Sequence, residues 1–487
     1  MIKVAIDTDK VSVGVLYSNS KSKSRTEEEE QAERQKAVEE TLKYFRSFLP
    51  MILRVLAKIK DPRQPGKVQY KQAVLFIYGL LMFVFQVSSR REANRIFTKP
   101  MFIKNIKEMF PELADLPHAD TLEYFLELIG DDVNYIEKAL VENIIALIKN
   151  KKFQAYLVNN QYLIAIDGTK KLSRNYRFAK ECQERHHKRE GGGEEIEYYA
   201  YVLEANLVFP NGFTLPLLSE FLDRDYGDAI RNKQDCELNA FKRLAVRIKG
   251  YFPRLSIMLL LDGLYAVGTV MEICRKYDWD FMIVLKDNCL PSVWAEVNGL
   301  SQLKENKQNH FERKWGNRQQ KFYWVNDIEY YWNNDKKVET IHVVICEETW
   351  EEIDRDGKVI QKHSRHAWIS AKPLAKNNIH YRCNQAARHR WSIENCILVE
   401  KHYGYSYEHG FALDWNAMRG YHYLMRLGHL INQLASKSIY IVDMVRSKGN
   451  RAFILFVRET VTAPWLNLES IRTIVAKGNY QIRMDLG

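Results

Sequence analysis

Cysteine is scarce in this chain and never occurs in a close pair. The seven cysteines are scattered through 487 residues, with no C-x-x-C spacing among them. A disulfide framework usually needs an even set of cysteines, and zinc ribbons or knuckles need closely spaced pairs. The sequence therefore argues against both classes of site, and its cysteine usage is typical of a reducing compartment.

Long hydrophobic runs are also absent. The longest extends from Ala73 to Phe85, which is shorter than the ~20 apolar residues that cross a bilayer. The amino-terminal residues contain no apolar segment followed by a cleavage site, and no internal repeat is apparent. We therefore expect a cytoplasmic protein without a repeat architecture.

The composition is typical of a globular protein with a basic excess. Hydrophobic residues make up 46% of the chain and charged residues 27%, and the formal net charge is +11. A chain of this length is expected to contain several domains. The positive charge favours a polyanionic partner over an acidic protein or a neutral metabolite.

Hydrophobic periodicity divides the chain into segments. Residues 1–25 end in a polar, serine- and lysine-rich stretch that is typical of a mobile tail. Residues 26–155 have helical periodicity and predict an all-α DNA-binding domain. Residues 156–290 and 372–435 alternate short strands with helices, which predicts a mixed α/β core. A β-rich insertion subdomain is expected at 291–371, and residues 436–487 carry no motif.

Two apolar strands of the expected core end at an Asp-Gly pair. The strand Tyr162–Ile166 leads to Asp167, and the strand Ser256–Leu261 leads to Asp262. An Asp-Gly pair is also a common turn signal, so either pair alone favours a turn. Two such aspartates at the carboxyl ends of strands in one α/β core predict a shared site.

A helix predicted over residues 385–401 supplies a third carboxylate. Arg390, Glu394 and Lys401 lie on one face of this helix. An Arg390–Glu394 pair is also a common surface decoration, and two other glutamates are alternatives, Glu400 and Glu408. We favour Glu394 because only it has basic residues on both sides along that face. Three carboxylates suit two Mg²⁺ ions, for which Mn²⁺ substitutes, and they should repel one another without metal.

The pattern resembles the bacterial insertion-sequence DDE transposases of the cut-and-paste branch. Their glutamate helix has the signature Tyr-x-x-Arg-x-x-x-Glu-x-x-x-x-x-x-Lys. In this chain Arg390, Glu394 and Lys401 stand at the arginine, glutamate and lysine places, and Ala387 stands at the tyrosine place. The resemblance covers roughly residues 156–435.

The resemblance implies a DNA transposase with an RNase H-like core interrupted by a β-rich insertion. Such an enzyme cuts DNA at the ends of its element and joins them to target DNA, with two Mg²⁺ ions held here by Asp167, Asp262 and Glu394. The implied partner is double-stranded DNA, bound by a homodimer associated with the bacterial nucleoid. Arg390 and Lys401 would bind phosphates at the element's end.

Further DNA contacts are expected outside the glutamate helix. A basic cluster follows the first aspartate, in a stretch that Gly191–Gly193 marks as a flexible loop, and it is expected to bind phosphates through Lys170, Lys171 and Arg174. A solvated loop without DNA contacts is the alternative. Trp315 lies beside basic residues in the β-rich segment. It is our candidate for stacking on an unpaired base, as related transposases do when they form a DNA hairpin. Packing within the small core of that segment is the alternative.

Three other functions share parts of this pattern. Haloacid-dehalogenase-type phosphatases also have Asp-Gly-Thr after their first strand, but they need a nucleophilic aspartate where this chain has Ala165. A transposase-derived DNA-binding protein without catalysis would not need all three carboxylates. A plain nuclease with the same core is harder to distinguish from a transposase, although the helical domain and the insertion favour transposition.

Overall fold

A computed structural model describes residues 26–188, 192–224, 234–303, 308–354, 357–478 and 480–486. The tail expected at 1–25 lies outside these residues, as does part of the expected glycine-rich loop. The described residues form a mixed α/β protein with an all-helical amino-terminal region, which confirms that part of the fold prediction. In the described ranges, no helix is both long and apolar enough to cross a membrane.

The helices and strands follow one another in this order. The amino-terminal region contains α1 (Glu27–Leu56), α2 (Gln72–Val84), α3 (Arg90–Phe97), α4 (Pro100–Met109), α5 (Ala119–Leu128) and α6 (Asn134–Lys149). The core contains β1 (Tyr162–Arg174), β2 (Gln183–Lys188), β3 (Glu194–Val208), β4 (Thr214–Phe221), α7 (Glu237–Tyr251), β5 (Ile257–Leu261), α8 (Gly268–Lys276) and β6 (Asp280–Val284). The β-rich segment contains α9 (Pro291–Ser301), β7 (His310–Trp315), β8 (Arg318–Trp332), β9 (Lys337–Ile353) and β10 (Val359–Ser370). The remaining helices are α10 (Trp391–His402), α11 (Trp415–Ala435), α12 (Val442–Lys448), α13 (Asn450–Val461) and α14 (Leu468–Lys477).

Ten strands among the described residues form one continuous sheet. Their order is β2-β3-β1-β5-β6-β10-β9-β8-β7, and β4 pairs with β3. Strands β1, β5 and β6 are parallel to one another, whereas β3 and β10 run antiparallel to their core neighbours. The β-rich segment therefore extends the core sheet edge to edge through β6 and β10. Pairing between strands so distant in sequence leaves no local pattern, so we did not predict it.

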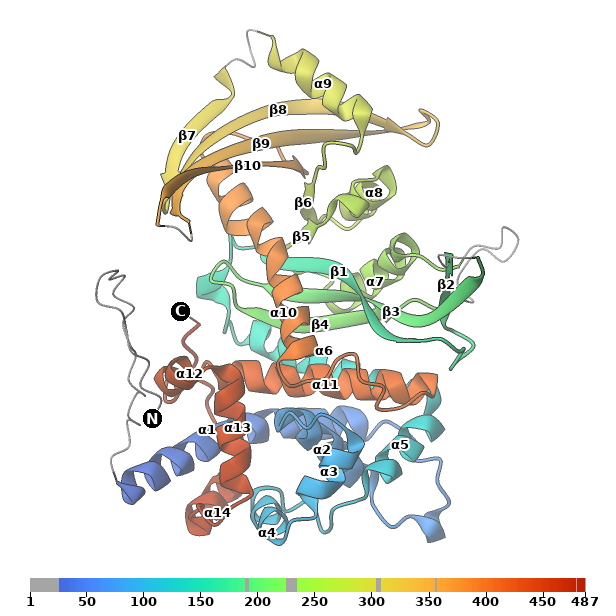
Figure 1. Cartoon of the computed structure of the whole chain (residues 1–487), viewed down its shortest axis with the longest axis vertical. Helices are drawn as coiled ribbons and strands as arrows, with labels where there is room; N and C mark the ends of the chain where they lie inside the picture. Colours follow the sequence, from blue (N-terminus) through green and yellow to red (C-terminus); the bar gives the residue numbers. More distant parts are fainter. Residues whose placement is uncertain are drawn as a thin grey trace.

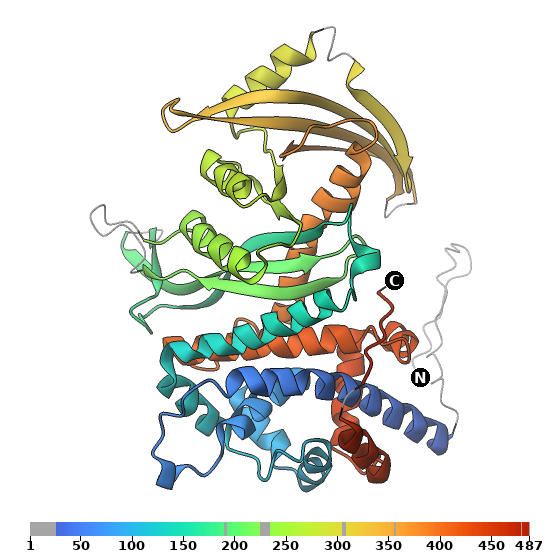
Figure 2. The ribbon, with the colours of Figure 1, turned by 180° about the vertical axis from the view of Figure 1, so that it is seen from behind.

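The elements are stacked in three layers along the long axis (Figure 1). The β-rich segment lies at one end, the core sheet lies in the middle, and α1–α6 with α11–α14 form a helical unit at the other end. The described residues after 435 are part of this unit: Asn105 of α4 donates to the carbonyl oxygen of Val461 at 2.9 Å, and Tyr44 of α1 donates to that of Arg483 at 2.8 Å. Helices α7 and α8 cover one face of the core sheet, and α10 crosses the other (Figure 2).

Two elements near the expected site differ from the sequence-based prediction. Strand β1 does not end before Asp167 but continues to Arg174, because β3 pairs with it along this extension. The helix expected from Gln385 begins at Trp391. The residues before it form a π-helical turn and a 3₁₀ turn, Tyr381–Ala386 and Ala387–Arg390. Such irregular turns often occur at functional sites.

A buried ion network fixes α10 between the sheet and the helical unit. Arg426 of α11 contacts Glu204 of β3, and its guanidinium lies 3.8 Å from Oε2 of Glu400 on α10. The hydroxyl of Tyr407 donates to Glu204 at 2.7 Å. His429 Nδ1 lies 2.7 Å from Oε1 of Glu400. Three parts of the structure therefore meet at one set of side chains.

Helices α2 and α11 pack so closely that Gly428 has no room for a side chain. A Cβ there would lie 2.8 Å from the Cβ of Phe83 and 3.3 Å from its carbonyl carbon. We expect Gly428→Ala to destabilise the protein, because overpacking costs ~1–3 kcal/mol and the helix propensity of alanine regains only ~1 kcal/mol. Gly250→Ala in α7 is the control, since its Cβ would meet nothing within 4 Å. Urea unfolding of both variants measures the difference, and equal stability would contradict the close packing.

Candidate active site

The register of two parallel strands places Asp167 beside Asp262. Ile166 of β1 pairs with Leu261, the last residue of β5. The two aspartates are the next residues along their strands, so they lie side by side at the edge where β5 ends. Asp167 remains within β1, whereas Asp262 directly precedes the 3₁₀ turn Gly263–Tyr265. Both side chains are partly buried.

Helix α10 brings Glu394 to the same place. Arg390 donates from Nη2 to Oε1 of Glu394 at 2.7 Å. The positive charge of Arg390 lowers the pKa of both Asp167 and Asp262, and the negative charge of Glu394 raises the pKa of Asp167. Arg390 is buried, and its Nε has no hydrogen-bond partner among the described residues. The structure therefore gathers the three predicted carboxylates around one buried guanidinium.

The surroundings of the two aspartates shift their pKa values in opposite directions. Burial, reinforced by Glu394 and opposed by Arg390, raises the pKa of Asp167 to about 6. Burial would also raise the pKa of Asp262, but Lys286, whose ammonium lies 2.9 Å from Oδ2, together with the backbone N–H of Gly263 and the charge of Arg390 lowers it. The repulsion expected among the three carboxylates is thus offset at Asp262 by Lys286 and at Glu394 by Arg390. In the described part of the chain, no ion pair involves Asp167.

The glycine of each Asp-Gly pair has a packing role, and only the second pair, Asp262-Gly263, also opens a turn. Neither glycine has a positive φ. A Cβ on Gly168 would lie 2.8 Å from Cδ of Glu237, and a Cβ on Gly263 would lie 3.0 Å from side-chain carbons of Lys286. Each glycine therefore leaves room for a side chain that approaches from elsewhere in the chain. Sequence reasoning found the glycines but missed these two neighbours.

The donor set of the site suits a hard divalent cation in kind, since all three side chains offer carboxylate oxygens. Among the described residues, only Cys396, Glu400 and His429 place ligand atoms all within 4.8 Å of one another. That group belongs to the buried ion network, where His429 and Arg426 already surround Glu400. The three predicted carboxylates do not form so close a group, and two of them are held by basic partners.

The predicted phosphate-binding residues other than Arg390 are already paired or partly buried. Lys401 lies near the far end of α10, with Nζ 2.7 Å from Oε1 of Glu408. Lys170 pairs with Glu197 of β3. Arg174 is partly buried and donates from Nη1 to a backbone carbonyl at 2.8 Å. All three have some exposed surface, so phosphate binding by them stays a prediction.

Lys171 does not fit the role that we predicted for it. Its side chain is buried, and Nζ donates to the carbonyl oxygen of Tyr407. The pairing of β1 with β3 shifts register between Lys170 and Leu172, and this bulge leaves Lys171 unpaired with its side chain turned inward. Burial, opposed by nearby glutamates, lowers the pKa of Lys171 to about 8. The prediction that Lys171 contacts DNA was therefore wrong.

Trp315 lies on β7 and is partly buried. The guanidinium of Arg388 lies 5.0 Å from the centroid of its ring. Arg388 also contacts Glu348, a fully buried residue of β9 that accepts a hydrogen bond from Arg318 at 2.7 Å. Sequence reasoning missed Glu348, although the alternation of β9 places it on the buried face. Base stacking by Trp315 stays a prediction, and any base would share the ring with Arg388.

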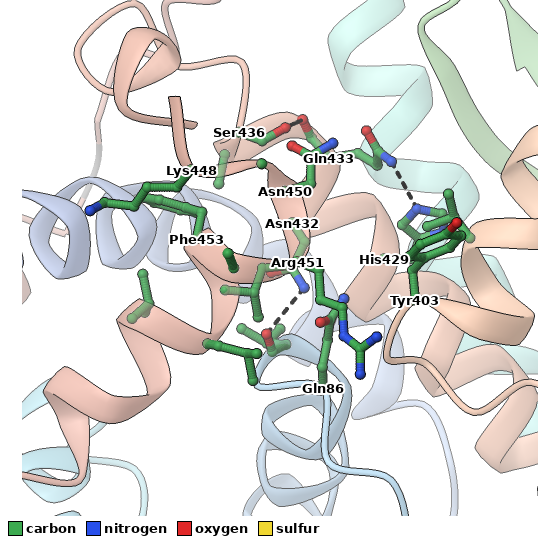
Figure 3. Close-up of a pocket in the computed structure, with 18 of the residues that line it drawn as sticks. Gln86, Tyr403, His429, Asn432, Gln433, Ser436, Lys448, Asn450, Arg451 and Phe453 are labelled. Carbon is green, nitrogen blue, oxygen red and sulfur yellow. Dashed lines mark hydrogen bonds between the residues drawn. The ribbon is translucent and has the colours of Figure 1, made fainter. Parts of the chain in front are cut away.

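A separate cavity of about 530 Å³ lies near the other end of α10 (Figure 3). Residues from α2, α10, α11 and α13 line it, and His429 accompanies Gln433 at its wall, with 2.9 Å between Nε2 atoms. None of the three carboxylates lines this cavity. It is therefore distinct from the candidate active site.

No family model matches the chain, and no curated protein sequence matches it either.

The opposite pKa shifts predict opposite effects of neutralising the two aspartates in metal-free protein. The folded-state pKa of Asp167, about 6, exceeds the unfolded value of about 4, so the charged form destabilises the fold as pH rises through this window. We expect Asp167→Asn to stabilise the protein by about 1–2 kcal/mol at pH 7.5 and by clearly less at pH 4.5.

Asp262→Asn is the matched control for this measurement. It removes the partner of Lys286, so it should destabilise the protein by about 0–1 kcal/mol near neutral pH. The lowered pKa of Asp262 means that its contribution is lost as pH falls. Urea unfolding with a chelator at both pH values gives the comparison. Effects of the same sign at pH 7.5 would contradict this description of the site.

Proposed function

We propose that this chain is a DDE-type transposase, which cuts DNA strands at the ends of an element and joins them to target DNA. The observation that carries the proposal is the placement of Asp167 and Asp262 side by side, with Glu394 beside them on a crossing helix. Neither Glu400 nor Glu408 reaches this place, because the former lies in the buried ion network and the latter pairs with Lys401.

We further propose that the core is RNase H-like. The strand order β4-β3-β1-β5-β6 supports this, with β1 carrying the first aspartate at the centre. The parallel neighbour β5 ends at the second aspartate, and the helix that carries Glu394 packs on β1, β3 and β4. The β-rich segment lies in the chain between the second aspartate and the glutamate helix, as in the transposases that the sequence resembles.

Each side chain of the site has a defined part in this proposal. Asp167, Asp262 and Glu394 would hold two Mg²⁺ ions, or Mn²⁺ in their place. When bound, such ions activate an attacking oxygen and stabilise the leaving 3′ oxygen. Arg390 supplies a buried positive charge with an unpartnered Nε, which suits a phosphodiester and the negative charge that develops during phosphoryl transfer. Lys286 holds Asp262 in place until a cation competes for it.

The proposed partner is double-stranded DNA, bound by a homodimer. The net charge of +11 supports a polyanionic partner. Lys170, Arg174 and Lys401 are the proposed phosphate contacts beyond the site, and Trp315 is the proposed stacking residue. A plain nuclease with the same core is the second candidate, because the carboxylate geometry alone supports cleavage without joining.

Incubation of the purified protein with DNA that carries its gene's own flanking sequences, plus Mg²⁺ or Mn²⁺, tests the proposal. We expect 3′-OH products at defined ends, followed by joined products. Asp167→Asn, Asp262→Asn and Glu394→Gln should each abolish cleavage and retain end binding, and the triple variant should be no worse than each single one. Glu127→Gln, an exposed change on α5, is the control. Cleavage without joining would favour a nuclease, and active single variants would refute the proposed site.

Salt dependence of DNA binding distinguishes the partly exposed Arg174 from the buried Lys171. If Arg174 contacts a phosphate, Arg174→Gln should reduce the slope of log affinity against log salt by ~0.9. Lys171→Met should leave the slope unchanged, because Lys171 is buried. Fluorescence anisotropy at several salt concentrations measures both slopes. An unchanged slope for Arg174→Gln would remove this residue from the proposed interface.

A further inference from the structure

Glu237 connects strand β3 to the turn that follows Asp262, on the face of the sheet opposite α10. It is the first residue of α7, the helix on the face opposite α10. Its Oε1 accepts a hydrogen bond from the hydroxyl of Tyr201 at 2.8 Å, and its Oε2 accepts one from Tyr265 at 3.0 Å. Tyr201 lies on β3, paired with β1 just beyond Asp167, and Tyr265 ends the 3₁₀ turn that follows Asp262. One carboxylate thus connects the surroundings of both aspartates.

The contact with β1 is tight at the residue after Asp167. A Cβ on Gly168 would lie 2.7 Å from Cε1 of Tyr201 and 2.8 Å from Cδ of Glu237. Successive side chains of a strand point to opposite faces. Asp167 is thus directed toward α10, and the backbone of Gly168 rests against the Glu237–Tyr201 pair on the α7 side. A displacement of that pair would therefore shift the backbone that carries Asp167.

The two tyrosines are well placed to hold this carboxylate. Tyr265 is buried, with its ring centroid 5.5 Å from that of Phe241 on α7. Burial, reinforced by the charge of Glu237, raises the pKa of both tyrosines, so their hydroxyls stay protonated and donate. In the described part of the chain, no ion pair involves Glu237. The two hydroxyls are therefore its principal fixed contacts.

We propose that Glu237 is a positioning residue of the active site. With Tyr201 and Tyr265 it forms a strut that sets the spacing of Asp167 and Asp262, and it acts through hydrogen bonds and not as a ligand. This inference rests on the proposed function, because the spacing matters only if the two aspartates share metal ions. The strut explains why glycine follows Asp167 within a strand, where no turn requires one.

Two variants separate the hydrogen bonds from the charge. The double variant Tyr201→Phe/Tyr265→Phe removes both hydrogen bonds and keeps the carboxylate. Glu237→Gln removes the charge but keeps both hydrogen bonds, because an amide can accept from one hydroxyl and donate to the other. We expect the double variant to lower Mn²⁺ affinity and the single-turnover cleavage rate by about 10- to 100-fold, since small misplacements of reacting groups have effects of this size. DNA-end binding should stay unchanged, and Glu237→Gln should stay within about threefold of the wild type in all three measurements.

Gly168→Ala is an independent test that changes no titratable group. Its methyl group must displace Tyr201 or Glu237, so it should reproduce the losses of the double variant. Electron paramagnetic resonance titration measures Mn²⁺ affinity, and a melting curve for each variant shows that it is folded. If the double variant does not fold, Tyr201→Phe alone replaces it, with a smaller loss expected in the same direction.

The outcomes distinguish the strut from the proposed function. A wild-type protein that neither binds Mn²⁺ nor cleaves DNA would overturn the proposed function and the strut with it. A wild type that does both while the double variant and Gly168→Ala match it would overturn the strut alone. Loss of Mn²⁺ binding in Glu237→Gln but not in the double variant would also overturn the strut, because the carboxylate would then act as a ligand.

Discussion

The place of helix α10, and with it the candidate site, depends on one buried arginine. Arg426 lies between Glu204 of β3 and Glu400 of α10, and all three side chains are buried. An unpaired charge at such depth is strongly unfavourable, so each member requires the others. Glu204 pairs across the sheet with Asp167, and Glu394 lies less than two turns before Glu400 on the same helix. The contact that anchors α10 therefore also brings Glu394 to the first aspartate.

Local patterns were sufficient to predict the parts of the site that lie on regular elements. Apolar runs identified the strands that lead to Asp167 and Asp262, and α/β folds commonly place such strand ends together. The spacing along one helix face distinguished Glu394 from Glu400, and the structure places only Glu394 beside the aspartates. These predictions needed no knowledge of distant contacts, because strand and helix periodicity determine which side chains share a face.

Contacts between distant residues account for what the sequence did not reveal. A bulge turns Lys171 inward, although a lysine in a basic cluster is normally exposed. The pairing of β6 with β10 joins two segments far apart in the chain. Gly168 has the sequence of a turn but lies within β1, where Tyr201 and Glu237 approach it from other elements. In each case the determining partner lies outside any local window, so composition and periodicity carry no signal of it.

The site contains its own counter-charges, and these determine how ligands could enter it. Lys286 pairs with Asp262 and Arg390 pairs with Glu394, which leaves Asp167 as the carboxylate without an ion pair among the described residues. A divalent cation displaces no ion-pair partner at Asp167, although Arg390 lies near it, and must compete with an ammonium at Asp262. A phosphate near Arg390 would compete with Glu394 for the guanidinium and release that carboxylate for the cation. Under the proposed function, DNA and metal therefore favour each other's binding, because each weakens an ion pair that opposes the other.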